Sequence, residues 1–562
     1  MGSSWTSLGD ELMKVVIIGG VAGGMSAATR MRRLDADAEI IVIEKSGHVS
    51  YANCGLPYYV GGVIEEEEAL LLQTPASLHA RFRLDVRIAS EVTAIDPAKR
   101  TVHVLNELSG EEYELSYDKL VLSPGASPVV PPIPGIERAL TLRTVEDVEK
   151  IFARVEQKPA TAVVIGGGFI GVEIAENLTH KGIHTTIVEA SPQLLAPLDP
   201  EMATLVAKEM KRNGVDLHLG AAAANITETS VTLNNGVEIP AELIILAIGV
   251  RPDTKLAKDA GLVIGSRGGI SVDEFNRTSN LDIYAVGDVA EKTDAIDGSS
   301  TLVPLANLAN RHGRVVADHI AGRTTRPVKT IGTAIVKVFD LMIAATGWNE
   351  KRLANSERKY QVIHTHPNSH AGYYPGAHQM SLKLIFDSKT GEILGAQGIG
   401  SEGVDKRIDV IATAIRGGIT APELADLELA YAPPFGSAKD AINMLGYVSE
   451  NILSGLLETA QWNQIDSYLQ KGFELIDVRS PSEFAAGAIP GAKSIPVDEI
   501  RSRVSELKQK NVLVNCQVGQ RGHTATMLLK ELGYNAVNLD GGYLTWSNSP
   551  ASLKEKEKEY VS

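Results

Sequence analysis

The sequence predicts an α/β protein with two parallel βαβ units, then a mixed α+β domain and a smaller C-terminal α/β domain. The pattern strand, glycine-rich loop, helix, strand occurs twice, first in residues 13–45 and again from Ala162. Hydrophobic residues make up 44% of the chain and aromatic residues only 5%, which is typical of a core of Val, Ile, Leu and Ala. A chain of 562 residues is long enough for about three to four domains.

Composition and charge exclude several classes of protein. The net charge of −15 argues against a nucleic-acid-binding surface. No stretch of ~18 apolar residues is present, so we expect no membrane span. Two cysteines cannot form a disulfide framework, which favours a reducing, cytoplasmic compartment. Residues 1–12 lack the basic and apolar regions of a secretory signal, and we interpret them as an unstructured extension before Met13.

The second glycine loop has the full G-x-G-x-x-G spacing, placed after a strand and at the start of a helix. Its glycines allow a tight turn and the close approach of a pyrophosphate, whose charge the helix N-terminus attracts. Glu189 ends the following strand, where an acid can bind a ribose and repel a 2′-phosphate. We therefore expect NADH, with NADPH as the alternative. The predicted contact residues of this Rossmann-like unit are Gly166, Gly168, Phe169, Ile170, Gly171 and Glu189.

The first glycine loop departs from the fingerprint, because Val21 stands where the middle glycine is expected. Glu44 at the end of the next strand, and a helix of small residues that can pack close to a strand, still favour a dinucleotide. The predicted contact residues of this loop are Gly19, Gly20, Ala22, Gly23, Gly24 and Glu44. Two such sites in one chain predict two dinucleotides that exchange electrons.

Three further segments resemble the pyridine nucleotide–disulfide oxidoreductases. LDIYAVGDVAE (281–291) resembles the second flavin motif of that family, in which the aspartate, here Asp288, holds the FAD ribityl chain. YDKLVLSPGA (117–126) and LIILAIGVRPD (243–253) resemble its strands between the two nucleotide domains. The resemblance implies FAD at the first loop, with Lys45 and Asn53, NAD(P)H at the second, with Gly249, and a homodimer. The implied domains are an FAD domain (13–126 and 255–329), an NAD domain (127–254), an α+β dimerisation domain (330–454) and a last domain (462–555).

Cys54, in the segment SYANCGLPYY, is the candidate redox centre of this half of the chain. Most members of the family carry C-x4-C, but here no second cysteine follows. The segment instead resembles the single-cysteine branch, which contains coenzyme A disulfide reductase, NADH oxidase or peroxidase, and NADH-dependent persulfide reductase. Gly55, Leu56 and Pro57 predict a helix start, whose N-terminus is expected to lower the pKa of the Cys54 thiol.

Arginines follow the first glycine loop and could bind a phosphorylated ligand. Arg30 and Arg33 share one helical face with Arg32 beside them, and Arg81 and Arg83 come later. The pattern alone fits a solvated basic face equally well. The resemblance favours coenzyme A beside Cys54, bound by Ser50, Asn53, Arg33 and Arg81. It also implies two tyrosines that act from the partner subunit, here Tyr373 and Tyr431.

The C-terminal region resembles a rhodanese. FELIDVRSPSEFAAGAIPGAKSIPV (473–497) matches its signature, and LVNCQVGQRGHTA places Cys516 in a loop between a strand and a helix. Gly519 and Gly522 let backbone N–H groups face the sulfur, and Arg521 adds a positive charge. The C-x4-R spacing makes a small loop, which suits sulfur more than phosphate.

Together these features predict a flavin-dependent reductase of sulfane sulfur with no metal site. NADH would reduce FAD, and the reduced flavin would cleave a mixed disulfide between Cys54 and coenzyme A. The substrate would be a persulfide, a polysulfide or a CoA disulfide, with hydrogen sulfide released from a persulfide. Cys516 would relay sulfane sulfur from a donor. The alternatives are a coenzyme A disulfide reductase or NADH oxidase, and a thiol redox sensor with slow turnover.

Overall fold

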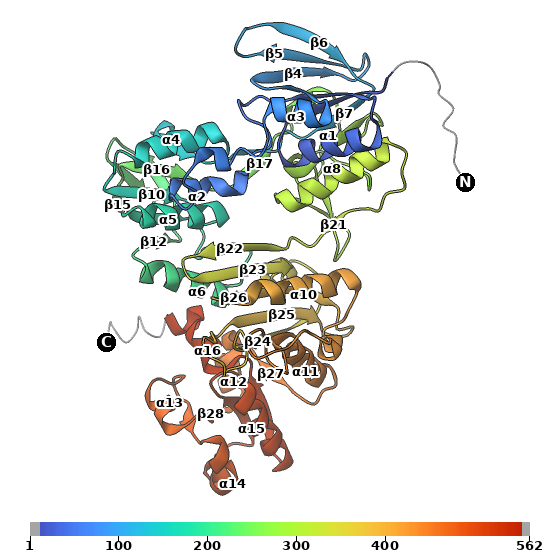
Figure 1. Cartoon of the computed structure of the whole chain (residues 1–562). Coiled ribbons are helices and arrows are strands. Elements are labelled where there is room, and N and C mark those ends of the chain that lie inside the picture. The colour runs from blue at the N-terminus through green and yellow to red at the C-terminus, as the bar shows by residue number, and fades with distance from the viewer. Residues whose placement is uncertain (1–11, 554–562) are drawn as a thin grey trace, which may run out of the picture. The chain divides into compact units, whose positions relative to one another are not determined.

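The computed structural model describes residues 12–553 (Figure 1). Of the predicted extension 1–12 only Leu12 is described, and the last two residues of the predicted domain 462–555 also lie outside the described range. The chain forms two compact units. The first contains the described residues up to Ala190 together with Ala221–Gly332, and the second contains Ser191–Gly220 and the described residues from Thr333.

A parallel sheet forms the centre of the FAD half of the first unit. Its central strands are short apolar runs that are buried on both faces, as a parallel sheet requires. In spatial order they are β18 (Ile283–Ala285), β7 (Lys119–Leu122), β1 (Lys14–Ile18), β2 (Glu39–Ile43) and β3 (Asp85–Arg87).

Helices cover one face of this sheet and an antiparallel sheet covers the other (Figure 1). On the first face α1 (Ala22–Leu34) lies beside α8 (Ala306–Ile320). They pack so closely that only glycine fits at position 313, because a Cβ there would lie 2.3 Å from the Gly23 carbonyl oxygen. The antiparallel strands are β4 (Ser90–Asp96), β5 (Thr101–Asn106) and β6 (Glu112–Ser116). Shorter elements are α2 (Leu56–Val60), α3 (Pro75–Phe82), α7 (Lys255–Asp259), β19 (Lys292–Asp294), β20 (Ser300–Thr301) and β21 (Lys329–Thr330).

The second βαβ unit repeats this arrangement. Parallel strands lie in the order β11 (His184–Glu189), β10 (Thr161–Ile165), β16 (Leu243–Leu246) and β9 (Leu140–Thr141). Helix α5 (Phe169–His180) connects β10 to β11, and α4 (Val145–Val155) follows β9. A small antiparallel sheet contains β13 (Ala223–Ile226), β14 (Ser230–Leu233) and β15 (Glu238–Pro240). The strands β8 (Ala126–Pro128) and β17 (Val250–Pro252) pair with each other where the chain passes between the two nucleotide domains.

The second unit contains an antiparallel sheet and a C-terminal parallel sheet. The antiparallel order is β22 (Ala334–Val338), β23 (Leu341–Gly347), β26 (Ile393–Gly400), β25 (Ser381–Asp387) and β24 (Tyr360–Thr365). Its helices are α6 (Pro200–Arg212), α9 (Glu350–Leu353), α10 (Val404–Gly417) and α11 (Ala441–Leu453), and β12 (Asp216–Leu219) follows α6.

The strands of the C-terminal parallel sheet lie in the order β27 (Thr459–Ala460), β31 (Asn535–Leu539), β30 (Asn511–Asn515), β28 (Glu474–Asp477) and β29 (Lys493–Ser494). Around it lie α12 (Ile465–Gln470), α13 (Pro481–Ala485), α14 (Ile500–Arg503), α15 (Gln520–Glu531) and α16 (Gly542–Ser547). The predicted α/β fold class is confirmed.

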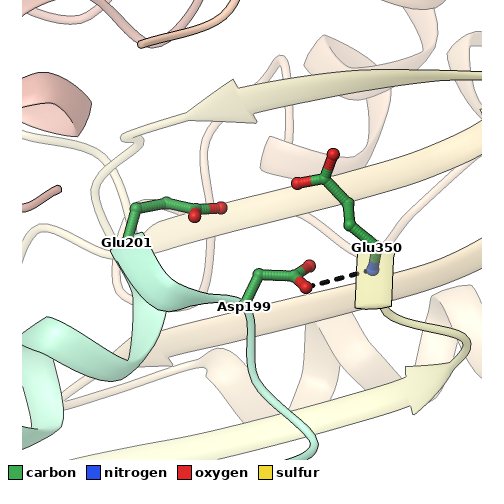
Figure 2. Close-up of side chains that lie close together, drawn as sticks. All are labelled: Asp199, Glu201 and Glu350. Carbon is green, nitrogen blue, oxygen red and sulfur yellow. Dashed lines mark hydrogen bonds between the residues drawn. The ribbon is translucent and has the colours of Figure 1, made fainter. Parts of the chain in front are cut away.

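A buried ionic cluster connects α6 to the antiparallel sheet of the second unit. Lys383 on β25 has no exposed surface, and its Nζ lies 2.8 Å from Asp199, 2.5 Å from Glu201 and 2.6 Å from Glu350. Figure 2 shows these three acids, and the Glu350 backbone N–H also donates to Asp199 at 3.0 Å. The carboxylate oxygens lie close enough together to hold a metal ion, but the Lys383 ammonium already occupies the place of a cation.

His364 extends this cluster to the C-terminal domain. Its two ring nitrogens lie 2.6 Å from Asp540 and 3.0 Å from Glu201. Burial alone would lower the pKa of His364, but the two carboxylates raise it to about 9. The protonated ring therefore joins Asp540, which directly follows β31, to the N-terminal turn of α6.

Candidate active site

A cavity of about 710 Å³ in the first unit contains most of the predicted flavin and coenzyme A residues and Cys54. Its walls come from the loop after β1, the end of β2, the segment before α2, helix α3 and the turn that contains Asp288. The predicted residues that line it are Gly19, Ala22, Gly23, Glu44, Lys45, Ser50, Asn53, Cys54, Arg81 and Asp288. A volume of this size is in the range of small-molecule and cofactor pockets.

The remaining glycines of the first loop, Gly20 and Gly24, hold residues that line the cavity. Gly20 donates its backbone N–H to Glu44 at 2.7 Å. A Cβ at Gly24 would lie 1.9 Å from the Gly19 carbonyl oxygen, so only glycine permits this close turn between β1 and α1. The Glu44 carboxylate is thus held at the end of β2, where a ribose could donate its hydroxyl hydrogens.

Asp288 presents a carboxylate to the same cavity. Burial raises its pKa, while the charges of Lys292 and Arg143 lower it. The buried Lys292 ammonium donates to the carbonyl oxygens of Gly287 (2.6 Å) and Ala290 (2.9 Å), which holds the turn in place. A half-buried carboxylate that faces a cavity can accept hydrogen bonds from the hydroxyl groups of a ligand. The glycine cradle and the two acids therefore fit FAD.

Cys54 lies in a short 3₁₀ turn, Asn53–Gly55, and α2 begins directly after it at Leu56 with Pro57 in its first turn. The thiol is exposed to the cavity. The expected fall of its pKa is wrong for these surroundings, because burial raises the pKa of Cys54 and the carboxylates of Glu173 and Asp288 raise it further. A five-residue helix contributes too little positive potential to offset these two charges.

Glu173 is a site residue that the sequence analysis missed. It lies on α5 between Val172 and Ile174, which are fully buried, and it accepts a hydrogen bond from the Tyr58 hydroxyl at 3.1 Å. Burial and the neighbouring Glu176 raise the pKa of Glu173 to about 7, although the Tyr58 hydrogen bond lowers it. The sequence feature that could have indicated Glu173 is an acidic residue within the apolar run FIGVEIA.

The predicted coenzyme A residues divide into two groups. Ser50, Asn53 and Arg81 line the cavity together with Cys54. Ser50 holds a left-handed backbone (φ 51°), which hydrogen bonds to Gly20 and Leu72 maintain.

Arg33, by contrast, stacks on Phe82, with its guanidinium carbon 5.1 Å from the ring centre. The two neighbouring arginines of α1 already have partners. Arg30 bonds Asp318 at 2.6 Å, and Arg32 donates to backbone carbonyl groups. Of these predicted arginines, Arg81 lines the cavity, whereas Arg30, Arg32, Arg33 and Arg83 do not.

The second glycine loop repeats the geometry of the first. Gly166 has a φ of 114°, and the Gly167 N–H donates to Glu189 at 2.7 Å, as Gly20 does to Glu44. Helix α5 begins at Phe169 and Ile170 and directs its free N–H groups toward the loop. Gly249, with a φ of 115°, ends the short turn between β16 and β17. These residues fit a dinucleotide pyrophosphate and ribose.

Two alanine substitutions separate folding from nucleotide binding at this loop. A Cβ at Gly166 would lie 2.4 Å from the Ala247 carbonyl oxygen, so we expect Gly166→Ala to destabilise the unit by about 1–3 kcal/mol. A Cβ at Gly168 would meet no atom within 4 Å. We expect Gly168→Ala to keep the melting temperature but to raise the KM for NADH about tenfold or more, because the methyl group projects toward the pyrophosphate. Equal KM values in Gly168→Ala and the wild type would contradict this placement.

The two tyrosines predicted to act across a dimer lie together in the second unit. The hydroxyl groups of Tyr373 and Tyr431 are 3.1 Å apart, and both side chains are exposed. The hydrogen bond to Tyr431 raises the pKa of Tyr373. The neighbouring Tyr374 instead packs edge-on against His370.

The Cys516 loop lies between β30 and α15. The Gly519 N–H donates to the Cys516 sulfur at 3.1 Å, and the thiol is fully buried. A Cβ at Gly522 would lie 2.2 Å from Asn538 Oδ1. The Gly519 N–H therefore faces the sulfur, and Gly522 packs too closely against Asn538 for a larger residue.

Arg521 makes a contact that the sequence does not reveal. Its guanidinium donates two hydrogen bonds to Glu483 on α13, at 2.6 and 2.8 Å. This contact lowers the pKa of Glu483 to about 2. The Cys516 charge still raises the pKa of Arg521, so the guanidinium remains within electrostatic reach of the loop.

Comparison with known proteins defines the class. The family model described as pyridine nucleotide-disulphide oxidoreductase matches residues 13–313, its dimerisation domain matches 333–441, and a rhodanese-like domain matches 460–549. The chain belongs to the pyridine nucleotide-disulphide oxidoreductases and carries a C-terminal rhodanese-like domain. The predicted class, a flavin- and pyridine-nucleotide-dependent oxidoreductase, is confirmed.

Individual relatives match all or part of this arrangement. Coenzyme A disulfide reductase of Staphylococcus haemolyticus (strain JCSC1435) is 34% identical over 443 residues, which cover 78% of this chain and 100% of that protein. The reduced Bacillus anthracis CoADR-RHD structure is 48% identical with a TM-score of 0.94, covering 96% of this chain and 98% of that chain. The NAD-dependent persulfide reductase from A. fulgidus is 38% identical with a TM-score of 0.90, covering 95% and 100%. Among the described residues no helix combines the length and apolar character that a membrane crossing needs.

Proposed function

We propose that this protein is an NADH-dependent, FAD-containing reductase of sulfane sulfur that uses coenzyme A persulfide or a related polysulfide. The main support for this proposal is the Cys54 thiol, which lies in one cavity with Ser50, Asn53 and Arg81. The chain has only one other cysteine, Cys516, and it lies in the second unit. No second cysteine of the first unit is available to Cys54, so disulfide chemistry there needs a thiol from outside this unit.

The chain's residues suit each part of this reaction. Gly19, Gly23, Glu44 and Asp288 would hold FAD, which supplies the two-electron link between nicotinamide and sulfur. Arg81 would bind phosphate at the same cavity, and Glu189 favours NADH over NADPH.

The sulfur chemistry balances with two electrons. The Cys54 thiolate attacks the inner, carbon-bonded sulfur of coenzyme A persulfide, so the S–SH bond breaks, an S–S bond forms between Cys54 and coenzyme A, and hydrosulfide leaves. Two electrons from NADH then break that bond and return two thiolates. The net reaction is NADH, one proton and coenzyme A persulfide to NAD⁺, coenzyme A and hydrogen sulfide.

The persulfide substrate is favoured over a coenzyme A disulfide by the C-terminal domain. The Staphylococcus relative aligns over its full length with only 78% of this chain. The A. fulgidus persulfide reductase covers 95% of it. Cys516, held by the Gly519 N–H, would accept sulfane sulfur from a donor and pass it to a coenzyme A thiol. We place the enzyme in a reducing, cytoplasmic compartment, because both cysteines are free thiols.

A homodimer completes the proposal. The exposed hydroxyl pair of Tyr373 and Tyr431 would face the Cys54 site of the partner, where it can donate hydrogen bonds to a leaving thiolate. The matching dimerisation domain supports this assembly.

A substrate panel tests the function. Hydrogen sulfide release and NADH oxidation would be measured with coenzyme A persulfide, coenzyme A disulfide and oxygen as separate acceptors. The proposal predicts the highest kcat/KM with the persulfide. A higher value with the disulfide or with oxygen would assign the chain to one of those activities. Turnover far below ~1 s⁻¹ with every acceptor would favour a redox sensor.

Mass analysis for FAD and coenzyme A, with and without dithiothreitol, identifies the cofactors and any mixed disulfide.

Replacing Cys516 with serine tests the relay. With thiosulfate or polysulfide as donor and coenzyme A present, we expect Cys516→Ser to lower the rate of hydrogen sulfide release by at least about 100-fold, because the acceptor sulfur is lost. The same variant should reduce preformed coenzyme A persulfide at the wild-type rate, which serves as the matched control. An unchanged rate with every donor would remove Cys516 from the pathway.

A further inference from the structure

A half-buried acid, Glu173, lies within electrostatic range of Cys54 in the first unit. Glu173 projects from α5, its neighbours Val172 and Ile174 have no exposed surface, and its carboxylate accepts a hydrogen bond from Tyr58 at 3.1 Å. Helix α2, which carries Tyr58, packs directly against α5. A half-buried carboxylate is costly unless a partner or a proton compensates for its charge.

Tyr58 contacts this acid and shares one helical segment with Cys54. It follows Cys54 by four residues in one continuous helical segment, so the two side chains project on the same side, one turn apart. The Cys54 charge is among the causes that raise the pKa of Tyr58, after burial and Glu173. The tyrosine therefore lies within electrostatic range of the thiolate and in direct contact with the acid.

We propose that Glu173, acting through the Tyr58 hydroxyl, stores the proton that Cys54 gives up and returns it to the thiolate that leaves when the mixed disulfide is reduced. This inference rests on the proposed function for the identity of the leaving thiolate. Glu173 contacts neither sulfur and acts only through Tyr58.

The proton transfers balance. As Cys54 ionises, its proton moves to Tyr58 while the Tyr58 proton moves to Glu173, which gives a thiolate and a neutral acid. When the mixed disulfide accepts two electrons, coenzyme A leaves as a thiolate. Glu173 then returns the proton along the same path, and coenzyme A departs as a thiol. A proton from solvent restores the neutral acid for the next cycle.

The charges around the pair support this assignment. The pKa of Glu173, about 7, lets the acid hold and release a proton at neutral pH. The Glu173 carboxylate raises the pKa of Cys54, so the two groups favour sharing a single proton. The other charges that face them are Glu176 on α5 and Asp288 across the cavity, and both also favour protonation.

The first test measures the ionisation of Cys54 in the holoenzyme. The rate of iodoacetamide alkylation would be followed against pH, with the Cys54 peptide quantified by mass so that Cys516 does not interfere. Glu173→Gln removes the opposing charge, so we expect the alkylation pKa of Cys54 to fall by about one unit. Tyr59→Phe is the matched control, because Tyr59 stacks on Phe152 and removal of its hydroxyl should leave the profile unchanged.

The second test compares leaving groups. A coenzyme A thiolate needs a proton as it leaves, but the thiolate of an aromatic disulfide with an acidic thiol does not. We expect Glu173→Gln and Tyr58→Phe to lower kcat with coenzyme A persulfide or disulfide by about 10²-fold. With the aromatic disulfide, kcat should stay within about twofold of the wild type, and the KM for NADH should not change.

The outcomes separate this inference from the proposed function. If both variants keep the wild-type alkylation profile and the wild-type ratio of rates between the two leaving groups, the relay is wrong and the function stands. An equal loss with both leaving groups also overturns the relay, because it indicates a structural role. If the wild type reduces no coenzyme A compound, the function fails, and the alkylation profile alone decides whether Glu173 controls Cys54. FAD content is measured in every variant, and Tyr58→Phe tests the relay if Glu173→Gln does not fold.

Discussion

Replacing Cys54 with serine is expected to abolish NADH-dependent reduction of every sulfur acceptor, with a loss of rate on the order of 10³-fold or more. The cause is chemical, because a serine hydroxyl stays protonated at neutral pH and cannot form a reducible bond to sulfur. No other cysteine in the first unit can replace it, since Cys516 lies in the second unit.

The variant should remain folded and loaded with cofactor. Cys54 is exposed to the cavity, so its sulfur contributes little packing energy, and the flavin residues Gly19, Glu44 and Asp288 are untouched. We expect FAD content and melting temperature to match the wild type. Cys516→Ser, assayed with preformed coenzyme A persulfide, is the matched control. A Cys54→Ser enzyme that keeps more than about one tenth of the wild-type rate would show that the thiol is not the reacting group.

Replacing Lys383 with methionine is expected to destabilise the second unit by about 3–5 kcal/mol. The substitution conserves most of the side-chain volume but removes the one cation that Asp199, Glu201 and Glu350 share. Asp199 and Glu201 are almost fully buried, so their charges cannot be solvated in the folded state.

The effect should depend on pH in a defined direction. Burial raises the pKa of Glu201, but Lys383 and His364 together bring it well below its ordinary value. A lowered pKa contributes stability above the unfolded value and loses it in acid. Without Lys383 the pKa of Glu201 rises, so protonation relieves the uncompensated charge. We therefore expect the difference in unfolding free energy between wild type and variant to be larger at pH 8 than at pH 5.

Tryptophan fluorescence can follow this unit separately. Three of the four tryptophans, Trp348, Trp462 and Trp546, lie in the second unit, and Trp5 lies outside the described residues. Flavin fluorescence reports on the first unit. Lys255→Met is the control, because Lys255 pairs with Asp259 at the surface and its loss should leave both transitions unchanged. A Lys383→Met protein with wild-type stability at pH 8 would show that the cluster does not support the fold.

Local backbone geometry explains why the glycine loops could be predicted. Each loop needs a positive φ and a close approach within a few residues, as at Gly166, and its acid ends the next strand, as Glu189 does. Cys54 and Cys516 are recognisable for the same reason, because their loops are continuous in the chain.

Through-space contacts could not be predicted in the same way. The arginine pattern of α1 predicts a phosphate site, which remains a prediction, but it does not reveal that Arg33 stacks on Phe82 or that Arg30 bonds Asp318. These partners come from other elements, and nothing in the spacing of the arginines indicates them. The expected fall in the pKa of Cys54 was wrong because the helix start is visible in the sequence while the opposing carboxylates are not.

The sequence by itself determined the order of domains, the two nucleotide loops and the two candidate reactive cysteines, because each depends on residues close together in the chain. Only the tertiary structure decided which charges surround them. Glu173 meets Tyr58 across 115 residues, and Lys383 meets Glu201 across 182. Burial and Coulomb energy depend on distance in space, so the protonation of Cys54 and the stability of the second unit follow from the fold.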